Sequence, residues 1–266
     1  MRTIDFQELV GQITSLVREV GAFIIGEYGK VREQQIAEKG HNMLVSYVDE
    51  EAEDRLISKL GPLLPNPSFL AEESESIGLK TDYRWIIDPL DGTTNFLHQI
   101  PCFAISIALE YKDQIVLGVV YELTKNEMFS AWKGGGAYLN ERPIQVRQIK
   151  SLGESLVATG FPYHDYSRTE AYCQVLKQLM QQTRGIRRMG SAATDLAYVA
   201  AGRFDAFFEY SLSPWDIAAG SIIAREAGAT VCDFSGKNNY LFGEEIIAVN
   251  PGIEKAFLEI IGEGFG

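Results

Sequence analysis

The sequence contains few cysteines, and they are not arranged for covalent cross-linking. Among its 266 residues only three are cysteine. Cys102, Cys173 and Cys232 are widely spaced, odd in number and outside any Cys-x-x-Cys pair. We therefore expect reduced core or surface thiols of a cytoplasmic protein.

Positive charge and long apolar runs are also scarce. The chain has 24 Lys and Arg against 36 Asp and Glu, a formal net charge of −12, which argues against a nucleic-acid or anionic-membrane surface. The N-terminal Met-Arg-Thr-Ile-Asp-Phe lacks the basic and apolar regions of a signal peptide. No apolar run is expected to be long enough to span a bilayer. Neither a membrane nor a nucleic acid is expected as a partner.

The size of the chain allows a large buried core. At 266 residues it exceeds the usual single domain, so one large domain or two intimately packed ones are expected, with the division at 1–145 and 146–266. An apolar content of 46% and a charged content of 23% are ordinary for a globular enzyme. No internal repeat or low-complexity linker appears.

Hydrophobic periodicity indicates an α/β protein. The first half predicts helices over 4–28 and about 48–60, then strands over 103–111, 115–121 and 128–132. The second half predicts helices near 168–182, 192–201, 217–227 and 252–261, and strands near 155–158, 204–209, 229–233 and 246–249. Gly134-Gly-Gly136 predicts a hairpin turn, since it lacks the Gly-x-Gly-x-x-Gly spacing of a nucleotide loop.

The most informative segment is 85–96, Trp-Ile-Ile-Asp-Pro-Leu-Asp-Gly-Thr-Thr-Asn-Phe. Its apolar start predicts a short buried strand, which should stop at Asp88 because Pro89 cannot donate to a strand ladder. Asp88, Asp91 and the Leu90 carbonyl then offer three hard oxygens. Such a set suits Mg²⁺ or Mn²⁺ rather than Zn²⁺.

The residues that follow add a site for an anion. Gly92 lets a ligand approach the main chain closely. Thr93-Thr-Asn95 can open a helix whose N–H groups attract a phosphate-sized anion. Metal and phosphate are therefore predicted to meet at one place. Asp-Pro and Asp-Gly also occur in ordinary turns, and either dipeptide alone would favour that simpler interpretation.

Asp216 lies in another segment of interest, Pro214-Trp-Asp-Ile-Ala-Ala-Gly220. Small and apolar residues after it predict a helix that Gly228 should end. Considered alone, Asp216 would be an ordinary N-cap.

Two more acidic segments lie upstream. Glu72 and Glu73 follow the apolar run Phe69-Leu-Ala, and such a pair alone would indicate a solvated loop. Since Asp88 also follows an apolar run, neighbouring strand ends can bring Glu72 to it. Asp49 ends the pattern Ser46-x-x-Asp49, a capping box for the helix that follows.

Together these segments resemble the inositol monophosphatase family, which comprises Mg²⁺-dependent, lithium-sensitive phosphomonoesterases. Segment 85–96 resembles the first family signature and segment 214–220 the C-terminal one, and both are specific. The Glu72-Glu73 pair, segment 44–51 and Glu38-Lys-Gly-His-Asn42 resemble smaller family blocks. The similarity spans nearly the whole chain. Met43 departs from the Asp or Asn that relatives often carry there, which affects the local bonds of the loop but not the metal ligands.

The resemblance implies a fold and a division of labour. The fold would be a five-layer αβαβα sandwich. Residues 1–145 would carry most metal ligands, and 146–266 would complete the substrate pocket and the second metal site. Family members are often homodimers.

The resemblance also implies residue roles. Glu72, Asp88 and the Leu90 carbonyl would bind a first Mg²⁺, Asp88, Asp91 and Asp216 a second, and a weaker third would lie near Glu72. Glu72, or the Thr93 hydroxyl backed by Asp49, would help deprotonate the attacking water, while the N–H groups of Gly92 and Thr93 hold phosphate. The substrate alcohol would contact Gly190, Ser191, Ala192, Glu209 and Asp216. Lys39 would lie on a mobile loop over the site, with Glu73 nearby.

Other phosphatase chemistries lack their residues. The spacing Asp88-x-x-Asp91 is not the Asp-x-Asp of a haloacid-dehalogenase-type enzyme, and no cysteine begins a Cys-x₅-Arg loop. His41, His98 and His164 are isolated in the sequence and form no covalent relay. Among the phosphatase mechanisms considered, direct attack on the phosphate by metal-activated water therefore remains.

Several functions stay open. The resemblance favours myo-inositol 1-phosphate as the small-molecule substrate, and Asp91-Gly-Thr-Thr-Asn-Phe96 differs from the Asp-Gly-Thr-Lys-Glu-Phe of nucleotide-type relatives. Fructose 1,6-bisphosphate is harder to exclude, and NADP or 3′-phosphoadenosine nucleotides are further alternatives. A non-catalytic metal-binding interaction protein is the distant alternative, which retention of every expected ligand disfavours.

Overall fold

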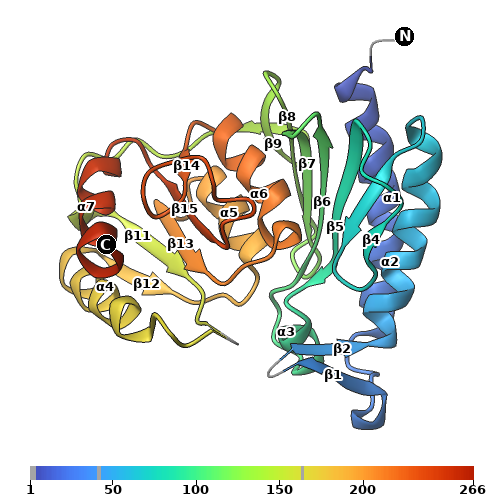
Figure 1. Ribbon diagram of the computed structural model, residues 1–266, viewed down its shortest axis with the longest axis horizontal. Coiled ribbons are helices and arrows are strands. Elements are labelled where there is room, and N and C mark those ends of the chain that lie inside the picture. Colours follow the sequence, from blue (N-terminus) through green and yellow to red (C-terminus); the bar gives the residue numbers. More distant parts are fainter. Residues whose placement is uncertain (1–3, 41–42, 163–164) are drawn as a thin grey trace.

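Five alternating layers of helix and sheet make up the computed structural model, which describes residues 4–40, 43–162 and 165–266 (Figure 1). The helices of the three helical layers are α1 (Phe6–Glu27) with α2 (Tyr47–Leu60), α5 (Ala192–Ala200) with α6 (Pro214–Glu226), and α4 (Thr169–Gln182) with α7 (Glu254–Phe265). The two sheets lie between these layers. The expected αβαβα sandwich is confirmed.

The larger sheet has eight strands in the order β10-β9-β8-β7-β6-β5-β3-β4. Their bounds are β3 Ser68–Ala71, β4 Glu75–Ile77, β5 Tyr83–Asp91, β6 Ala104–Tyr111, β7 Gln114–Glu122, β8 Glu127–Trp132, β9 Gly136–Leu139 and β10 Arg142–Ile144. All neighbours are antiparallel except β3 and β5. That one parallel pair brings the carboxyl ends of β3 and β5 to the same edge, where the candidate ligands follow.

The smaller sheet has five strands in the order β12-β11-β13-β15-β14. Their bounds are β11 Leu156–Thr159, β12 Gly185–Arg187, β13 Ala206–Tyr210, β14 Thr230–Cys232 and β15 Glu245–Val249. A separate hairpin joins β1 (Ile36–Gly40) to β2 (Met43–Ser46), and α3 (Thr93–Leu97) follows β5. Short 3₁₀ turns cover Glu33–Gln35, Gly61–Leu63 and Leu152–Glu154.

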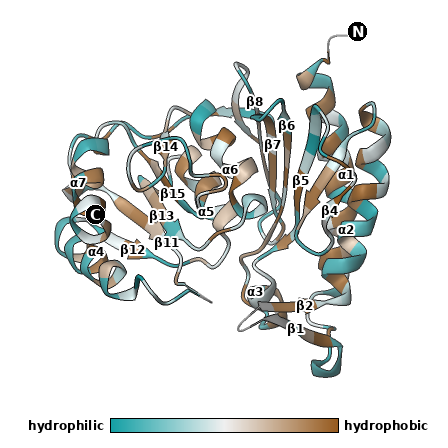
Figure 2. Cartoon of the chain, viewed as in Figure 1, coloured by the Kyte–Doolittle hydropathy of each residue, from teal (hydrophilic) through white to brown (hydrophobic). Residues whose placement is uncertain are grey.

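The central helices are apolar because they have sheets on both sides. All nine residues of α5 are buried, and α6 buries a continuous run from Ile217 to Ala224. A helix that is buried all round needs no polar face. The outer helices differ: Figure 2 shows hydrophilic residues on their outward sides and hydrophobic residues on the strands they cover.

The N-terminal helix departs from the expectation that no apolar run is long enough to span a bilayer. By length and composition alone, α1 is long and apolar enough to cross a membrane. Its apolar residues, however, form one stripe that packs into the fold: Ile13, Val17 and Ile24 are fully buried in a cluster with side chains of α2 and the large sheet. The other face of α1 is exposed.

The strand that carries the candidate ligands is longer than predicted. Instead of ending at Asp88, β5 continues through Pro89 to Asp91. The register with β6 shifts between Asp88 and Asp91, so Pro89 lies in a bulge where no ladder donor is needed. The start of α6 also differs from the prediction at 217, because Pro214 occupies the first turn. The Gly134–Gly136 hairpin turn is confirmed between β8 and β9.

Close packing of α6 on the large sheet generates a stability prediction. A Cβ atom at Gly118 of β7 would lie 2.6 Å from both the Ala219 carbonyl oxygen and Ile222 Cγ2 of α6. Gly118→Ala should therefore lower the free energy of unfolding by about 1–3 kcal/mol, the usual cost of overpacking. Gly11→Ala is the control, since nothing lies within 4 Å of that Cβ on an exposed face of α1. There, alanine should stabilise the helix by about 0.5–1 kcal/mol. Equal urea midpoints for the two variants would contradict this packing.

Candidate active site

The bulge at the end of β5 sets the positions of two acids. Within it, the Leu90 N–H donates to Asp88 Oδ1 at 2.9 Å, which fixes that carboxylate. The next residue after the strand, Gly92, has φ +94°, a conformation that favours glycine. A Cβ there would also lie 3.0 Å from the Cys102 carbonyl oxygen. Gly92 is thus required for the turn into α3, a role that the sequence did not predict.

Glu72 arrives at the same edge from β3. Because β3 and β5 run parallel, Ala71 pairs with Ile87, and the Glu72 N–H donates to the Ile87 carbonyl at 3.2 Å. The expectation that strand ends bring Glu72 to Asp88 is confirmed. Glu73 is not among the described residues that line the cavity. Its backbone N–H donates to Glu53 Oε2 at 2.8 Å.

Asp49 makes two sets of hydrogen bonds, one through each carboxylate oxygen. Its Oδ2 accepts from the Ser46 N–H at 2.9 Å and the Ser46 hydroxyl at 2.7 Å, which is the predicted capping box of α2. Its Oδ1 accepts from the Thr93 hydroxyl at 2.9 Å. The same hydroxyl lies 2.9 Å from the Leu90 carbonyl oxygen, so one proton is shared between two acceptors. The predicted capping box is confirmed, and Asp49 also makes the contact with Thr93 that its proposed catalytic role needs.

Asp216 occupies the third position of α6 rather than its N-cap. Ser213 is the N-cap, and its N–H donates to Asp216 Oδ2 at 2.7 Å in a second capping box. Gly228, with φ +95°, follows the end of the helix as predicted. The cap orients Asp216 toward the acids of β5.

The candidate metal-binding acids line one cavity of about 270 Å³, whereas Asp49 is not among its described lining residues. The cavity lining includes five predicted acids, two glycines and further predicted contact residues: Glu72, Asp88, Asp91, Glu209, Asp216, Gly92, Gly190, Leu90, Thr93, Ser191 and Ala192. The structure thus brings together most of the predicted site. Lys39 belongs to β1, but its side chain lies outside the described part of the chain, as do residues 41–42 and the side chain of Met43.

Asp91 joins the two sheets through α5. Its Oδ2 accepts from the Ser191 hydroxyl at 2.6 Å and from the Ala193 N–H at 2.7 Å. Ser191 is the N-cap of α5, so the carboxylate lies where the helix dipole favours negative charge. The segment predicted to contact the substrate alcohol is therefore held by a predicted metal ligand.

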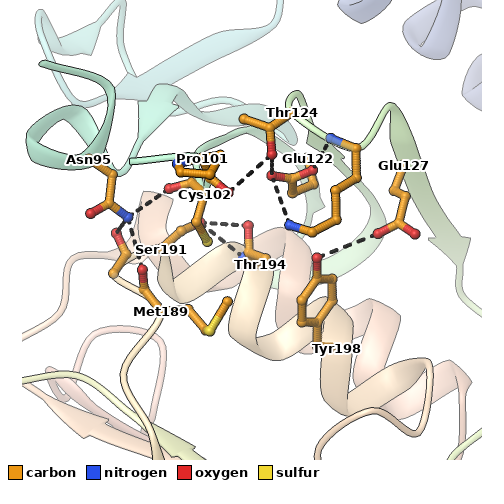
Figure 3. Close-up of polar contacts among 12 residues, drawn as sticks. Asn95, Pro101, Cys102, Glu122, Thr124, Glu127, Met189, Ser191, Thr194 and Tyr198 are labelled. Carbon is orange, nitrogen blue, oxygen red and sulfur yellow. Dashed lines mark hydrogen bonds and ion pairs between the residues drawn. The ribbon is translucent and has the colours of Figure 1, made fainter. Parts of the chain in front are cut away.

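Asn95 completes this junction and was not predicted as a site residue. Figure 3 shows its side-chain amide reaching the backbone on both sides of the junction. The amide donates to the Cys102 carbonyl at 2.7 Å and to the Met189 carbonyl at 2.9 Å. Asn95 thereby positions the segment that leads to Ser191. Only its place inside the 85–96 segment marked it in the sequence.

Burial and mutual repulsion dominate the electrostatics of the acids. Burial, then Glu72, Asp91 and Asp216, raise the pKa of Asp88. Burial raises the pKa of Asp91 to about 6, although the bonds from Ser191 and Ala193 oppose the shift. Burial and then Asp91 raise the pKa of Asp216. Without a counter-ion these carboxylates resist ionisation together.

The donor set fits a hard divalent cation. Every candidate ligand is an oxygen, and the negative charge of Glu72 helps to raise the pKa of Asp88, as expected for carboxylates gathered around a cation site. Within the described residues, no three His, Cys, Asp or Glu side chains form a compact metal cluster by themselves. The Leu90 carbonyl and a small approach of the four acids would complete such a site.

The far side of the cavity carries further charged residues. Glu209, on β13, lies directly over Gly160, where a Cβ would approach its carboxylate oxygens within 1.9 to 2.1 Å. Burial raises the pKa of Glu209 to about 8, and Arg188 opposes the shift. Arg188 and Asp195 also line the cavity and were not predicted. In the sequence, Asp195 has the appearance of one acid in an otherwise apolar helix.

Comparison with known proteins places this geometry in a family. The family model described as "Inositol monophosphatase family" matches residues 5–263. An inositol-1-monophosphatase of Mesorhizobium japonicum is 40% identical, with 95% of this chain and 96% of that protein covered. The Nus factor SuhB of Salmonella typhimurium is 42% identical, with 91% of each covered.

A solved structure agrees. The extragenic suppressor protein suhB from Bartonella henselae superimposes with a TM-score of 0.92 at 41% identity, covering 97% of this chain and all of that one. Family, relatives and fold coincide over nearly the full length. The chain belongs to the inositol monophosphatase family, and it is a phosphatase of that superfamily.

Proposed function

We propose that this protein hydrolyses the phosphate monoester of a polyol, with myo-inositol 1-phosphate as the first candidate, in a Mg²⁺-dependent reaction. The observation that carries the proposal is the meeting of Glu72, Asp88, Asp91 and Asp216 in one cavity beside Gly92. Members of the family are generally Mg²⁺-dependent. The site is built from oxygen donors, as that ion requires.

The acids would hold the metal ions in the family arrangement. Glu72, Asp88 and the Leu90 carbonyl form one site, and Asp88, Asp91 and Asp216 form the other, with a weaker third near Glu72. Bound Mg²⁺ would supply Lewis-acid activation of water and neutralise charge on the phosphate and the departing alkoxide. In this proposal residues 1–145 supply most ligands, and residues 146–266 supply Asp216 and the alcohol pocket.

Thr93 and Asp49 would handle the proton of the attacking water. The Thr93 hydroxyl already donates to Asp49 Oδ1, so its oxygen can accept a proton from water while its own proton moves to the carboxylate. Burial raises the pKa of Asp49, which makes it a stronger base than an exposed aspartate. Glu72 is the alternative base. The N–H groups of Gly92 and Thr93 would hold phosphate oxygens at the start of α3.

The substrate alcohol would lie on the far side of the cavity. Gly190, Ser191 and Ala192 form a wall of small residues, and Glu209 would accept a hydroxyl. Lys39, in the β1–β2 hairpin, would lie over the site, with Glu73, which follows β3, nearby. We further propose a cytoplasmic homodimer, in keeping with three free cysteines and the family.

The names of the relatives do not select one substrate. Proteins of about equal identity are named inositol-1-monophosphatase and Nus factor SuhB, so a role besides hydrolysis is a second candidate. A phosphate-release panel with inositol 1-phosphate, fructose 1,6-bisphosphate and 3′-phosphoadenosine, with and without Mg²⁺, tests the proposal. Preference for either alternative ester would redirect the substrate. No Mg²⁺-dependent release from any ester would leave the non-catalytic role.

Asp91→Asn should abolish turnover while the protein stays folded. The substitution keeps the volume and can keep one bond to α5, but it removes an anionic ligand. We expect the loss of at least a hundredfold in kcat, measured at saturating Mg²⁺ with far-ultraviolet circular dichroism as the folding control. Near-normal turnover by the folded variant would overturn the metal assignment.

The acids also predict how pH affects the metal-free protein. The folded-state pKa values of Asp88, Asp91, Asp216 and Glu209 are raised, so the native state binds more protons than the unfolded chain between about pH 4 and 8. The free energy of unfolding should therefore fall as pH rises through this range after chelation with EDTA. Mg²⁺ should restore thermal stability most at the alkaline end. A Tm that is independent of Mg²⁺ at pH 8 would count against metal binding here.

Glu209→Gln tests the alcohol pocket separately from the chemistry. A hydrogen bond to a charged group is worth about 1.5–3 kcal/mol, so kcat/KM for inositol 1-phosphate should fall by roughly tenfold to a hundredfold. Glycerol 2-phosphate, which has a smaller alcohol, should be affected less. Equal losses on both esters would show that Glu209 acts on the metals or the fold, and no loss on either would remove it from recognition.

A further inference from the structure

A second buried acid faces the alcohol side of the cavity and has no role in the scheme above. Asp195 lies one helical turn into α5 and is only 1% exposed. It lines the same cavity as Glu209. Its Oδ1 is fully buried and has no hydrogen-bond partner among the described residues. A buried carboxylate oxygen without a donor costs free energy, so such a group in a folded protein requires an explanation.

The surroundings of Asp195 make its burial still less favourable. Glu209 and Asp91 both act on it as like charges, and Arg188 is the cation that opposes them. Burial and then Asp195 raise the pKa of the nearby Cys102 to about 12, so it stays a protonated thiol, which is only a weak donor. Among the described residues, none forms a hydrogen bond with Asp195 Oδ1 that would offset this cost. A ligand in the cavity could instead donate to Oδ2, which is not among the fully buried, unpaired atoms.

The kind of donor follows from the position of Asp195. Asp195 lines the cavity together with Glu209 and Arg188, and both act on it electrostatically, as does the proposed metal ligand Asp91. A second anionic group on the substrate would meet two carboxylates there and be repelled. A neutral hydroxyl suits both kinds of neighbour, because it donates to a carboxylate and accepts from a guanidinium.

We propose that Asp195 contacts the substrate as a second hydroxyl acceptor, which together with Glu209 selects a neutral polyol with more than one free hydroxyl. This inference rests on the proposed function and extends it to a residue with no role there. It predicts discrimination against esters whose alcohol carries a second phosphate. Because Asp195 and Glu209 are two acceptors in the same cavity, a ring with several hydroxyls should also be held better than a short alcohol.

The test compares Asp195→Asn with the wild-type enzyme on inositol 1-phosphate and glycerol 2-phosphate. The substitution keeps the shape and removes the charge. We expect kcat/KM for the inositol ester to fall on the order of tenfold, mainly through KM, with a change below about threefold for glycerol 2-phosphate. The Mg²⁺ concentration at half-maximal activity should not change. Because a strained acid is neutralised, the Tm should be unchanged or higher.

Asp205→Asn is the matched control. Asp205 is also 1% exposed with a fully buried Oδ1, but its Oδ2 accepts from the Leu156 N–H at 2.9 Å and Arg147 pairs with it at 3.2 Å, away from the cavity. This variant should lower the Tm and leave the ratio of the two substrates unchanged.

Three outcomes would overturn the inference. Equal losses on both esters, a raised Mg²⁺ requirement, or a lowered Tm with an unchanged substrate ratio would assign Asp195 to the metals or to the fold. The proposed function fails separately, and visibly, if the wild-type enzyme does not prefer the inositol ester to glycerol 2-phosphate. A wild-type preference that survives in Asp195→Asn would refute the role of Asp195 alone.

Discussion

The bond between Asp91 and the start of α5 is the contact on which the rest of the site depends. Asp91 ends a strand of the large sheet, while Ser191 and Ala193 begin a helix of the central layer. This contact holds the segment from Gly190 to Ala192 next to the acids. Since the carboxylate is also a proposed metal ligand, one side chain sets both the register of the layers and the place of the chemistry. Asn95 reinforces the same junction from α3.

The site concentrates negative charge where a fold can least tolerate it. Asp88, Asp91, Asp195 and Glu209 are buried, and Asp216 is partly buried beside them. Five acids around one cavity, four of them buried, repel one another and lose hydration, which opposes folding of the empty protein. The apolar layers on either side offset this cost. Such an arrangement is typical of functional sites, where stability is given up for binding.

Much of this arrangement could be predicted from sequence because it is local. The capping box at Ser46, the stop of α6 before Gly228 and the ends of the long helices each depend on a few adjacent residues. The strand through Pro89 could not be predicted, because the bulge that accommodates it exists only once β6 is paired.

Other features were missed for similar reasons. Short strands such as β12, with three residues, have too little periodicity to identify. Arg188 and Asp195 gained meaning only when the fold placed them in the cavity. The roles of Asp49 show the opposite case, in which a local pattern was correct but incomplete, since Thr93 lies 44 positions away.

The packing of α6 places Asp216 against one sheet, whereas Glu209 lies on the other. Although α6 comes late in the chain, it lies against β6, β7 and β8 of the large sheet, so Asp216 moves with the same rigid layer as Asp88 and Asp91. Glu209 belongs instead to β13 of the smaller sheet. A small sliding of one sheet relative to the other would therefore reshape the space for the alcohol and leave the distances among the proposed metal-binding acids intact.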